Sequence, residues 1–187
     1  AAGIEGGALE ALGEGLMRHR DSLQVTVLAS QAVRVLGDSL RGSRSGAGQL
    51  PDVLVQSLQH WNQIATQAGD KASYADRAIA ELLKALFSVT IKAGPKGVQA
   101  ASSMQLARHV DAALQAAVES EEVCRAALRL LSELRAKRAG AATEAAMVEI
   151  MTVHGDKPEL LSAAKKEVYA LSGNNPGAGM DLFGLSI

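Results

Sequence analysis

One helical pattern occurs four times along this chain of 187 residues. An acidic residue is followed by Ala at the eighth residue, by an aliphatic residue at the twelfth and by a small or aliphatic residue at the fifteenth. The four sets are Asp21, Ala29, Val33 and Leu36; Asp70, Ala78, Leu82 and Ala85; Glu119, Ala127, Leu131 and Leu134; and Asp156, Ala164, Val168 and Leu171. Successive sets are 49, 49 and 37 residues apart. Periods of this length are typical of stacked helical repeats, in which each unit buries its apolar face against the next.

A pair of apolar residues lies upstream of each of these alanines, seventeen and thirteen residues before it. The pairs are Leu12 and Leu16, Trp61 and Ala65, Val110 and Leu114, and Met147 and Met151. Because a four-residue step keeps two side chains on one face of an α-helix, each pair predicts a helix that precedes the acidic residue. Each repeat is therefore expected to be a helical hairpin.

Helix start signals recur at the junction inside each hairpin. Asp21 is expected to cap one helix, and Asp156 another, with Pro158 in the first turn. In the third repeat Ser120 is the expected cap. A capping oxygen accepts hydrogen bonds from otherwise unpaired N–H groups and stabilises a helix by about 0.5–2 kcal/mol. We find no strand alternation and expect eight helices, over residues 7–19, 22–40, 51–68, 71–92, 98–118, 120–138, 141–153 and 157–171.

Residues 123–134 (VCRAALRLLSEL) resemble the last helix of an armadillo repeat, and residues 31–36 and 76–83 look like weaker copies. The resemblance covers most of residues 7–171. It implies an all-α fold, a right-handed α-solenoid of about four helical-hairpin repeats of the armadillo/HEAT class. Ala and Leu at these spacings also fit an antiparallel α-helical bundle, such as the Ala-rich bundles of cytoskeletal linkers. The helical-repeat domain is expected to span residues 1–172.

The resemblance also implies a binding surface rather than a catalytic one. Armadillo peptide carriers use ladders of Asn and Trp on the last helix of each repeat. This chain departs from that pattern, because its single tryptophan, Trp61, falls in the preceding helix. The residues after the apolar stripe are Gly37, Lys84, Ser132 and Ala170, where the carriers have Asn. A nuclear-import type of peptide groove is therefore not expected.

Composition excludes several functional classes. The chain has 19 basic and 20 acidic residues and a formal charge of −1, whereas dedicated nucleic-acid binders are usually basic. No apolar run reaches the roughly 18–20 residues that a membrane-spanning helix needs. The first residues, Ala1-Ala2-Gly3, lack a basic start followed by an apolar stretch, so they do not resemble a secretory signal. We expect an intracellular protein, with cytoplasm, cytoskeleton and organelle interior left open.

No residue pattern predicts catalysis, a cofactor or a metal site. His19 and His154 occupy equivalent positions in two repeats, and His60 and His109 do so in the other two, so they mark separated surfaces rather than one cluster. The chain has no Cys-x-x-Cys or His-x-x-x-His pair, no phosphate-binding glycine loop and no Gly-x-Ser-x-Gly motif. Cys124 lies in the apolar phase of a helix and is expected to be an inert buried thiol. We therefore expect a protein that is not an enzyme.

The predicted contact surfaces for protein partners are the C-terminal tail and Trp61. Residues 173–179 form a Gly/Asn/Pro spacer, which leads to an apolar tail over residues 180–187. The tail residues expected to contact a partner are Met180, Asp181, Leu182, Phe183, Leu185 and Ile187. Docking of the tail on its own last repeat is the alternative, and its Asp-Leu-Phe core resembles short motifs that clathrin-adaptor ear domains bind. Trp61 is the second predicted contact, because it is the largest single apolar anchor.

The sequence thus predicts a non-catalytic scaffold for protein–protein interaction, as a structural subunit or adaptor of a larger multiprotein assembly. Its partners are expected to be other protein subunits, with no nucleic acid and no transmembrane segment. Two alternatives stay open. One is an armadillo-type adaptor that binds extended peptides, and the other is an Ala-rich helical bundle that links cytoskeletal or trafficking components.

Overall fold

The structure, a computed structural model, describes residues 2–39, 49–68 and 73–172. Within these ranges the chain is helical and contains no strand. The helices are α1 (Ala2–Arg18), α2 (Leu23–Ser39), α3 (Leu50–Ala68), α4 (Ser73–Phe87), a short π-helix η2 (Ser88–Lys92), α5 (Pro95–Ser103), α6 (Leu106–Ala116), α7 (Glu121–Ala136), α8 (Glu144–Val153) and α9 (Pro158–Leu171). The all-α prediction is therefore confirmed. No described helix is both long enough and apolar enough to cross a membrane.

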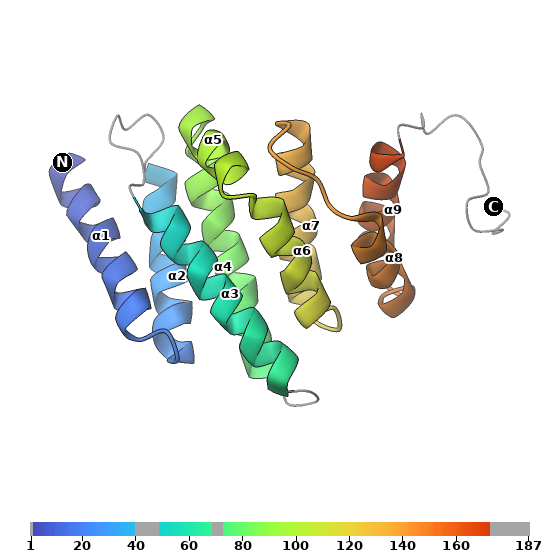
Figure 1. Ribbon diagram of the computed structural model, residues 1–187, viewed down its shortest axis with the longest axis horizontal. Helices are drawn as coiled ribbons and strands as arrows, with labels where there is room; N and C mark the ends of the chain where they lie inside the picture. The colour runs from blue at the N-terminus through green and yellow to red at the C-terminus, as the bar shows by residue number, and fades with distance from the viewer. Residues whose placement is uncertain (1, 40–48, 69–72, 173–187) are drawn as a thin grey trace, which may run out of the picture.

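The helices lie in two layers that run from one end of the molecule to the other (Figure 1). We call α1, α3, α6 and α8 the first layer, and α2, α4, α7 and α9 the second layer. Within each layer a helix packs on the next member, and the pairs α1–α2, α3–α4, α6–α7 and α8–α9 pack across the layers. As a result, α1 and α9 lie at opposite ends of the molecule (Figure 1).

The apolar positions of the sequence pattern line the interface between the layers. Ala29, Val33, Ala78, Leu82, Ala127, Leu131, Ala164 and Val168 are all buried. Of the upstream pairs, Leu16, Trp61, Ala65, Val110, Leu114 and Met147 are buried, and Leu12 and Met151 are partly buried against the same core. Alanine at the shared position brings two helices close together, because its methyl group fills little space between the backbones.

The segment between α4 and α6 differs from the prediction. The expected helix over residues 98–118 is two helices, α5 and α6, separated at Gln105, whose backbone is left-handed with φ of 52°. The expected helix 71–92 ends as the π-helix η2. The described chain thus has nine α-helices, not eight. The cause of the early helix end is local: only two residues separate η2 from α5, and a turn at Gly94, with φ of 84°, joins them. The helix α5 packs directly on η2, so close that a Cβ at Gly97 would lie 2.2 Å from the Thr90 carbonyl oxygen.

The capping predictions hold at one position and fail at two. Ser120 caps α7, since its Oγ accepts a hydrogen bond from Val123 N at 3.5 Å. At the start of α2 the accepting hydroxyl belongs to Ser22, and Asp21 instead lies 2.8 Å from His60. At the start of α9 the capping position is Lys157, with no side-chain hydrogen bond. Asp156 is one residue too far from the helix to reach its free N–H groups.

Polar contacts connect each hairpin to the next. Trp61 Nε1 donates to Thr26 Oγ1 at 3.1 Å, which joins α3 to α2. Thr143 N donates to Asp111 Oδ2 at 3.1 Å, which joins the start of α8 to α6. Burial raises the pKa of Asp111, and the hydrogen bond from Thr143 opposes that shift. Such contacts fix the rotation of each hairpin on its neighbour, because a buried polar group without a partner would be costly.

Candidate functional site

Trp61 lies in the core, not on a surface available to a partner. Its side chain is 1% exposed. Its ring packs edge-on against His60 and Tyr74, with centroids 6.1 and 6.2 Å apart. The prediction that Trp61 contacts a partner is therefore not supported, since a tryptophan buried this deeply joins α3 to α2 and α4 instead. The other predicted contacts lie outside the described residues: Met180, Asp181, Leu182, Phe183, Leu185 and Ile187.

Three of the four histidine side chains have a polar partner within the chain. His60 pairs with Asp21, and His109 Nδ1 lies 3.1 Å from Gln59 Nε2. His154 Nε2 lies 2.7 Å from the Val118 carbonyl oxygen. Among the described residues, no three His, Cys, Asp or Glu side chains are placed to hold a metal ion together.

Cys124 has the surroundings of an unreactive thiol. Its side chain is buried, and its Sγ donates to the Val118 carbonyl oxygen at 3.1 Å. Burial raises the pKa of Cys124 to about 12, and the charges of Glu149 and Asp76 add to the shift. The thiol therefore stays protonated at neutral pH, whereas a nucleophilic cysteine needs a thiolate.

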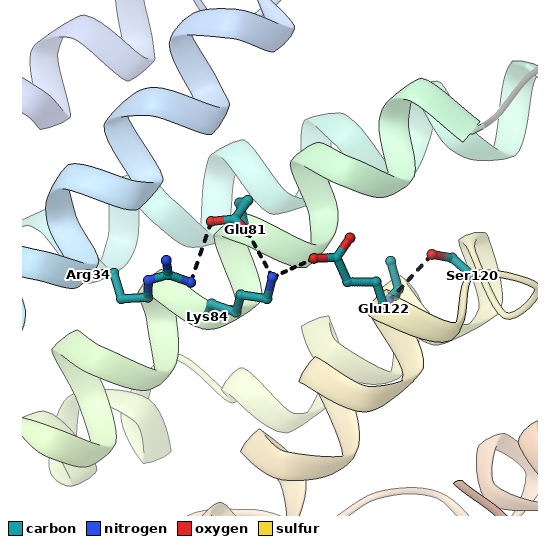
Figure 2. A network of polar contacts seen from close by, with 6 residues as sticks. Arg34, Glu81, Lys84, Ser120 and Glu122 are labelled. Carbon is teal, nitrogen blue, oxygen red and sulfur yellow. Dashed lines mark hydrogen bonds and ion pairs between the residues drawn. The ribbon is translucent and has the colours of Figure 1, made fainter. Parts of the chain in front are cut away.

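Charged side chains form a continuous row over the second layer. Arg34 on α2 pairs with Glu81 on α4 at 3.7 Å, and Lys84 binds Glu81 at 2.8 Å (Figure 2). Lys84 then reaches Glu122 on α7 at 2.5 Å. Burial alone would lower the pKa of Lys84, but the hydrogen bonds to Glu122 and Glu81 outweigh it and raise the pKa. The lysine is thus held in its charged form between two helices.

Arg125 extends the row from α7 to α9. Its guanidinium contacts Glu121 on the same helix at 2.5 Å and Glu159 at 2.6 Å. Both acidic partners and Arg125 are largely exposed. Exposed pairs of this kind contribute little stability, about 0–1 kcal/mol each. Their side chains therefore remain available to exchange partners with a ligand at small energetic cost.

Two adjoining hollows lie along this charged row. The first, of about 320 Å³, lies between α2, α4, η2 and α7. Five cations line it, together with the carboxylate of Glu122: Arg34, Lys84, Lys92, Arg125 and Arg129. The second, of about 350 Å³, lies between α7 and α9 and shares Arg125 and Arg129 with the first. The two hollows therefore lie side by side, with α7 as the shared wall.

Arg129 is the exposed residue between the two hollows. Its guanidinium carbon lies 4.5 Å from the centre of the Phe87 ring, which is a cation–π contact. In the part of the chain that the structure describes, Arg129 pairs with no carboxylate. The aromatic ring thus holds a guanidinium whose hydrogen-bonding edge stays open to solvent.

The sequence alone did not point to this surface. Its one local signal is the i, i+4 spacing of Glu121, Arg125 and Arg129 along α7, which is ordinary on an exposed helix face. Arg34, Lys84 and Phe87 come from two other helices and join the surface only through the packing of the second layer.

Comparisons with protein-family models, curated protein sequences and solved structures found no match to this chain.

Proposed function

We propose that this chain is a short α-solenoid of armadillo/HEAT-like hairpins and serves as a non-catalytic scaffold for protein–protein interaction, as a structural subunit or adaptor of a larger assembly. The observation that carries the proposal is the exposed face of the second layer, where a charged row and two adjoining hollows extend from α2 to α9. An extended face of this kind suits a partner that contacts several helices at once.

The order of helix contacts supports the solenoid. Each hairpin packs on the hairpin before it and on the one after it, through α1–α3, α3–α6 and α6–α8 in the first layer and α2–α4, α4–α7 and α7–α9 in the second. A closed bundle would instead bring the first and last hairpins together, and these lie at opposite ends of the molecule (Figure 1). Stacking by nearest neighbours is the defining property of solenoid repeats.

The chemistry of the second-layer face supports a protein partner. Arginine and aromatic residues are enriched among the residues that dominate binding at protein interfaces. Arg125, Arg129 and Phe87 supply both kinds here, and the half-buried Ala163 lies in the second hollow. Charged rims with a small apolar centre are typical of non-obligate interfaces.

The test is purification of the endogenous chain with its partners, identified and quantified by mass spectrometry. Three forms are compared with the intact chain: one that ends at Gly173, one that carries Arg125→Glu and Arg129→Glu, and a control that carries Arg108→Glu. Arg108 is an exposed arginine on α6, in the first layer. Amine-reactive cross-linking through Lys166, an exposed lysine of the second hollow, locates the contact.

We expect at least one stoichiometric partner that cross-links to the second layer. That partner should persist with the truncated chain and with Arg108→Glu, and should be lost with the double variant. If the partner is lost only with the truncated chain, the contact belongs to residues 180–187, and the second-layer face is not the binding surface. Absence of stoichiometric partners from every form would overturn the scaffold function itself.

A further inference from the structure

We propose that the two adjoining hollows of the second layer bind an extended acidic segment of a partner protein, with Arg129 as the central contact. This inference rests on the scaffold function proposed above and adds the chemistry of the partner. Four features of the surface support it: the charge of the first hollow, the orientation of Arg129, the continuity of the hollows and the local character of the positive charge.

The first hollow contains a cation that no glutamate of the described chain balances. Five cations and one carboxylate line it. Arg34, Lys84 and Arg125 already pair with glutamates of the chain, so most of this charge is balanced internally. Arg129 pairs with no carboxylate among the described residues. A ligand carboxylate would therefore gain an ion pair at Arg129 without displacing one that already exists.

The Phe87 ring orients the guanidinium of Arg129 for the contact with a ligand carboxylate. The ring lies under the guanidinium at 4.5 Å and is itself half-buried, so it restricts the orientation of the arginine. A planar guanidinium held in this way can donate two parallel hydrogen bonds to one carboxylate, a geometry that lysine cannot reproduce. Because less side-chain freedom is lost on binding, an ordered arginine binds more tightly than a mobile one.

The continuity of the hollows favours an extended segment over a single small anion. They share Arg125 and Arg129 on α7, and they open toward α2 and α4 on one side and toward α9 on the other. Neighbouring helices pack about 8–10 Å apart, so α4 and α9, on the outer sides of the two hollows, lie about 16–20 Å apart, and about six extended residues cover that distance.

The second hollow has balanced charge. Its charged lining residues are Arg125, Arg129 and Lys166, and Glu133, Glu159 and Glu167. The apolar residues that line it are buried or half-buried: Leu128, Leu160 and Ala163. The acidic residues of the segment therefore belong in the first hollow.

A protein segment fits this surface better than a nucleic acid does. The whole chain carries a formal charge of −1, so the positive charge is local to the first hollow. Nucleic-acid surfaces have a longer basic stripe that follows the phosphate backbone. A few carboxylates in an extended peptide match a hollow of this size and charge.

The test is fluorescence anisotropy with the full chain and a labelled nonapeptide of three Glu-Glu-Leu units. The same peptide with Gln in place of every Glu is the matched ligand control. We expect the Glu peptide to bind at least tenfold more tightly than the Gln peptide, and to weaken as salt is raised from 0.1 to 0.5 M.

The protein variants separate a local contact from overall charge. Arg129→Ala should weaken binding of the Glu peptide about tenfold, and Arg129→Lys should restore only part of the loss, because the two-pronged contact is missing. Arg108→Glu changes the net charge as much as Arg129→Glu does but lies on the first layer, so it should change affinity less than twofold. Circular dichroism and thermal unfolding confirm that each variant is folded.

Equal affinity for the Glu and Gln peptides would overturn the proposal, and so would equal losses with Arg129→Glu and Arg108→Glu. Tighter binding of a labelled ten-nucleotide single-stranded RNA at the same salt would assign the surface to nucleic acid instead. If the Glu peptide does not bind while stoichiometric partners still depend on Arg125 and Arg129, the inference of an acidic segment is wrong. The proposed scaffold function is then unaffected.

Discussion

At the residue scale, burial decides what individual side chains can do. Trp61 and Cys124 are the two side chains whose chemistry most often indicates function, and both lie in the core. Trp61 uses its N–H group to bind Thr26, and Cys124 uses its S–H group to bind a backbone carbonyl. Arg129 has a more ordinary identity but is exposed and oriented by Phe87. Exposure and neighbours therefore matter more here than residue type.

We predict that Cys124 reacts with iodoacetamide at pH 8 at least about a hundredfold more slowly in the native chain than in the chain unfolded in guanidinium. The pKa of about 12 leaves almost no thiolate at this pH, and burial blocks access to the reagent. Mass spectrometry of quenched samples measures both rates. Comparable rates in the two states would show that the thiol is accessible and the assigned environment is wrong.

At the element scale, the contacts between helices explain where the chain departs from its local preferences. The π-helix η2 lies under α5, and Gly97 provides the close approach between them. Near the C-terminal end of the second layer, Glu167 on α9 is only 2% exposed. It accepts two hydrogen bonds from Arg135 on α7, at 2.8 and 3.1 Å. Each of these contacts joins two different helices, η2 to α5 and α7 to α9.

Gly97→Ala is expected to lower the free energy of unfolding by about 1–3 kcal/mol, the range for an overpacked site. The added Cβ would lie 2.2 Å from the Thr90 carbonyl oxygen, a backbone atom that cannot move aside without shifting η2. Gly15→Ala on α1 is the matched control, since nothing lies within 4 Å of its Cβ position. Chemical denaturation measures the free energy of unfolding of both variants. A neutral effect of Gly97→Ala would mean that α5 is not seated on η2 as described.

Arg135→Ala is expected to lower the free energy of unfolding by about 2–4 kcal/mol, because it leaves the buried Glu167 carboxylate without its partner. Arg125→Ala also removes an arginine of α7 that binds a glutamate of α9, but both side chains are exposed, so the expected loss is much smaller. Urea titrations of the two variants give the comparison. Equal losses would contradict the burial of the Arg135–Glu167 pair.

At the scale of the whole molecule, the order of packing determines the shape. Consecutive hairpins pack on one another from one end of the molecule to the other, and the second-layer face runs along α2, α4, α7 and α9 (Figure 1). The charged row from Arg34 to Glu159 exists because α2, α4, α7 and α9 follow one another in that layer. A closed bundle of the same helices would fold that face inward.

Small-angle X-ray scattering is expected to give a radius of gyration clearly above about 16 Å, the value for a compact globule of this length. The pair-distance distribution should be asymmetric, with a tail toward long distances, as for an elongated particle. The chain that ends at Gly173 is measured alongside the intact chain, so that residues 174–187 do not account for the extension. A symmetric distribution near 16 Å from the shorter chain would favour the bundle.

The helical class and the buried positions follow from local sequence. Ala29, Val33, Ala127 and Leu131 recur at helical spacing, and an apolar stripe of that period can be buried only as one face of a helix. The Ser120 cap is local as well, since it needs only the hydroxyl and the next helical turn. These features were predictable because each depends on residues within a few turns of one another.

The remaining features depend on residues that are far apart in the sequence. Trp61 is buried because Thr26 meets it from α2 and Tyr74 meets it from α4. The hollow beside Arg129 needs side chains from α2, α4, η2 and α7 at once. Spacing within one helix carries no information on which helices lie next to it, so the tertiary packing alone determines the face that a partner would meet.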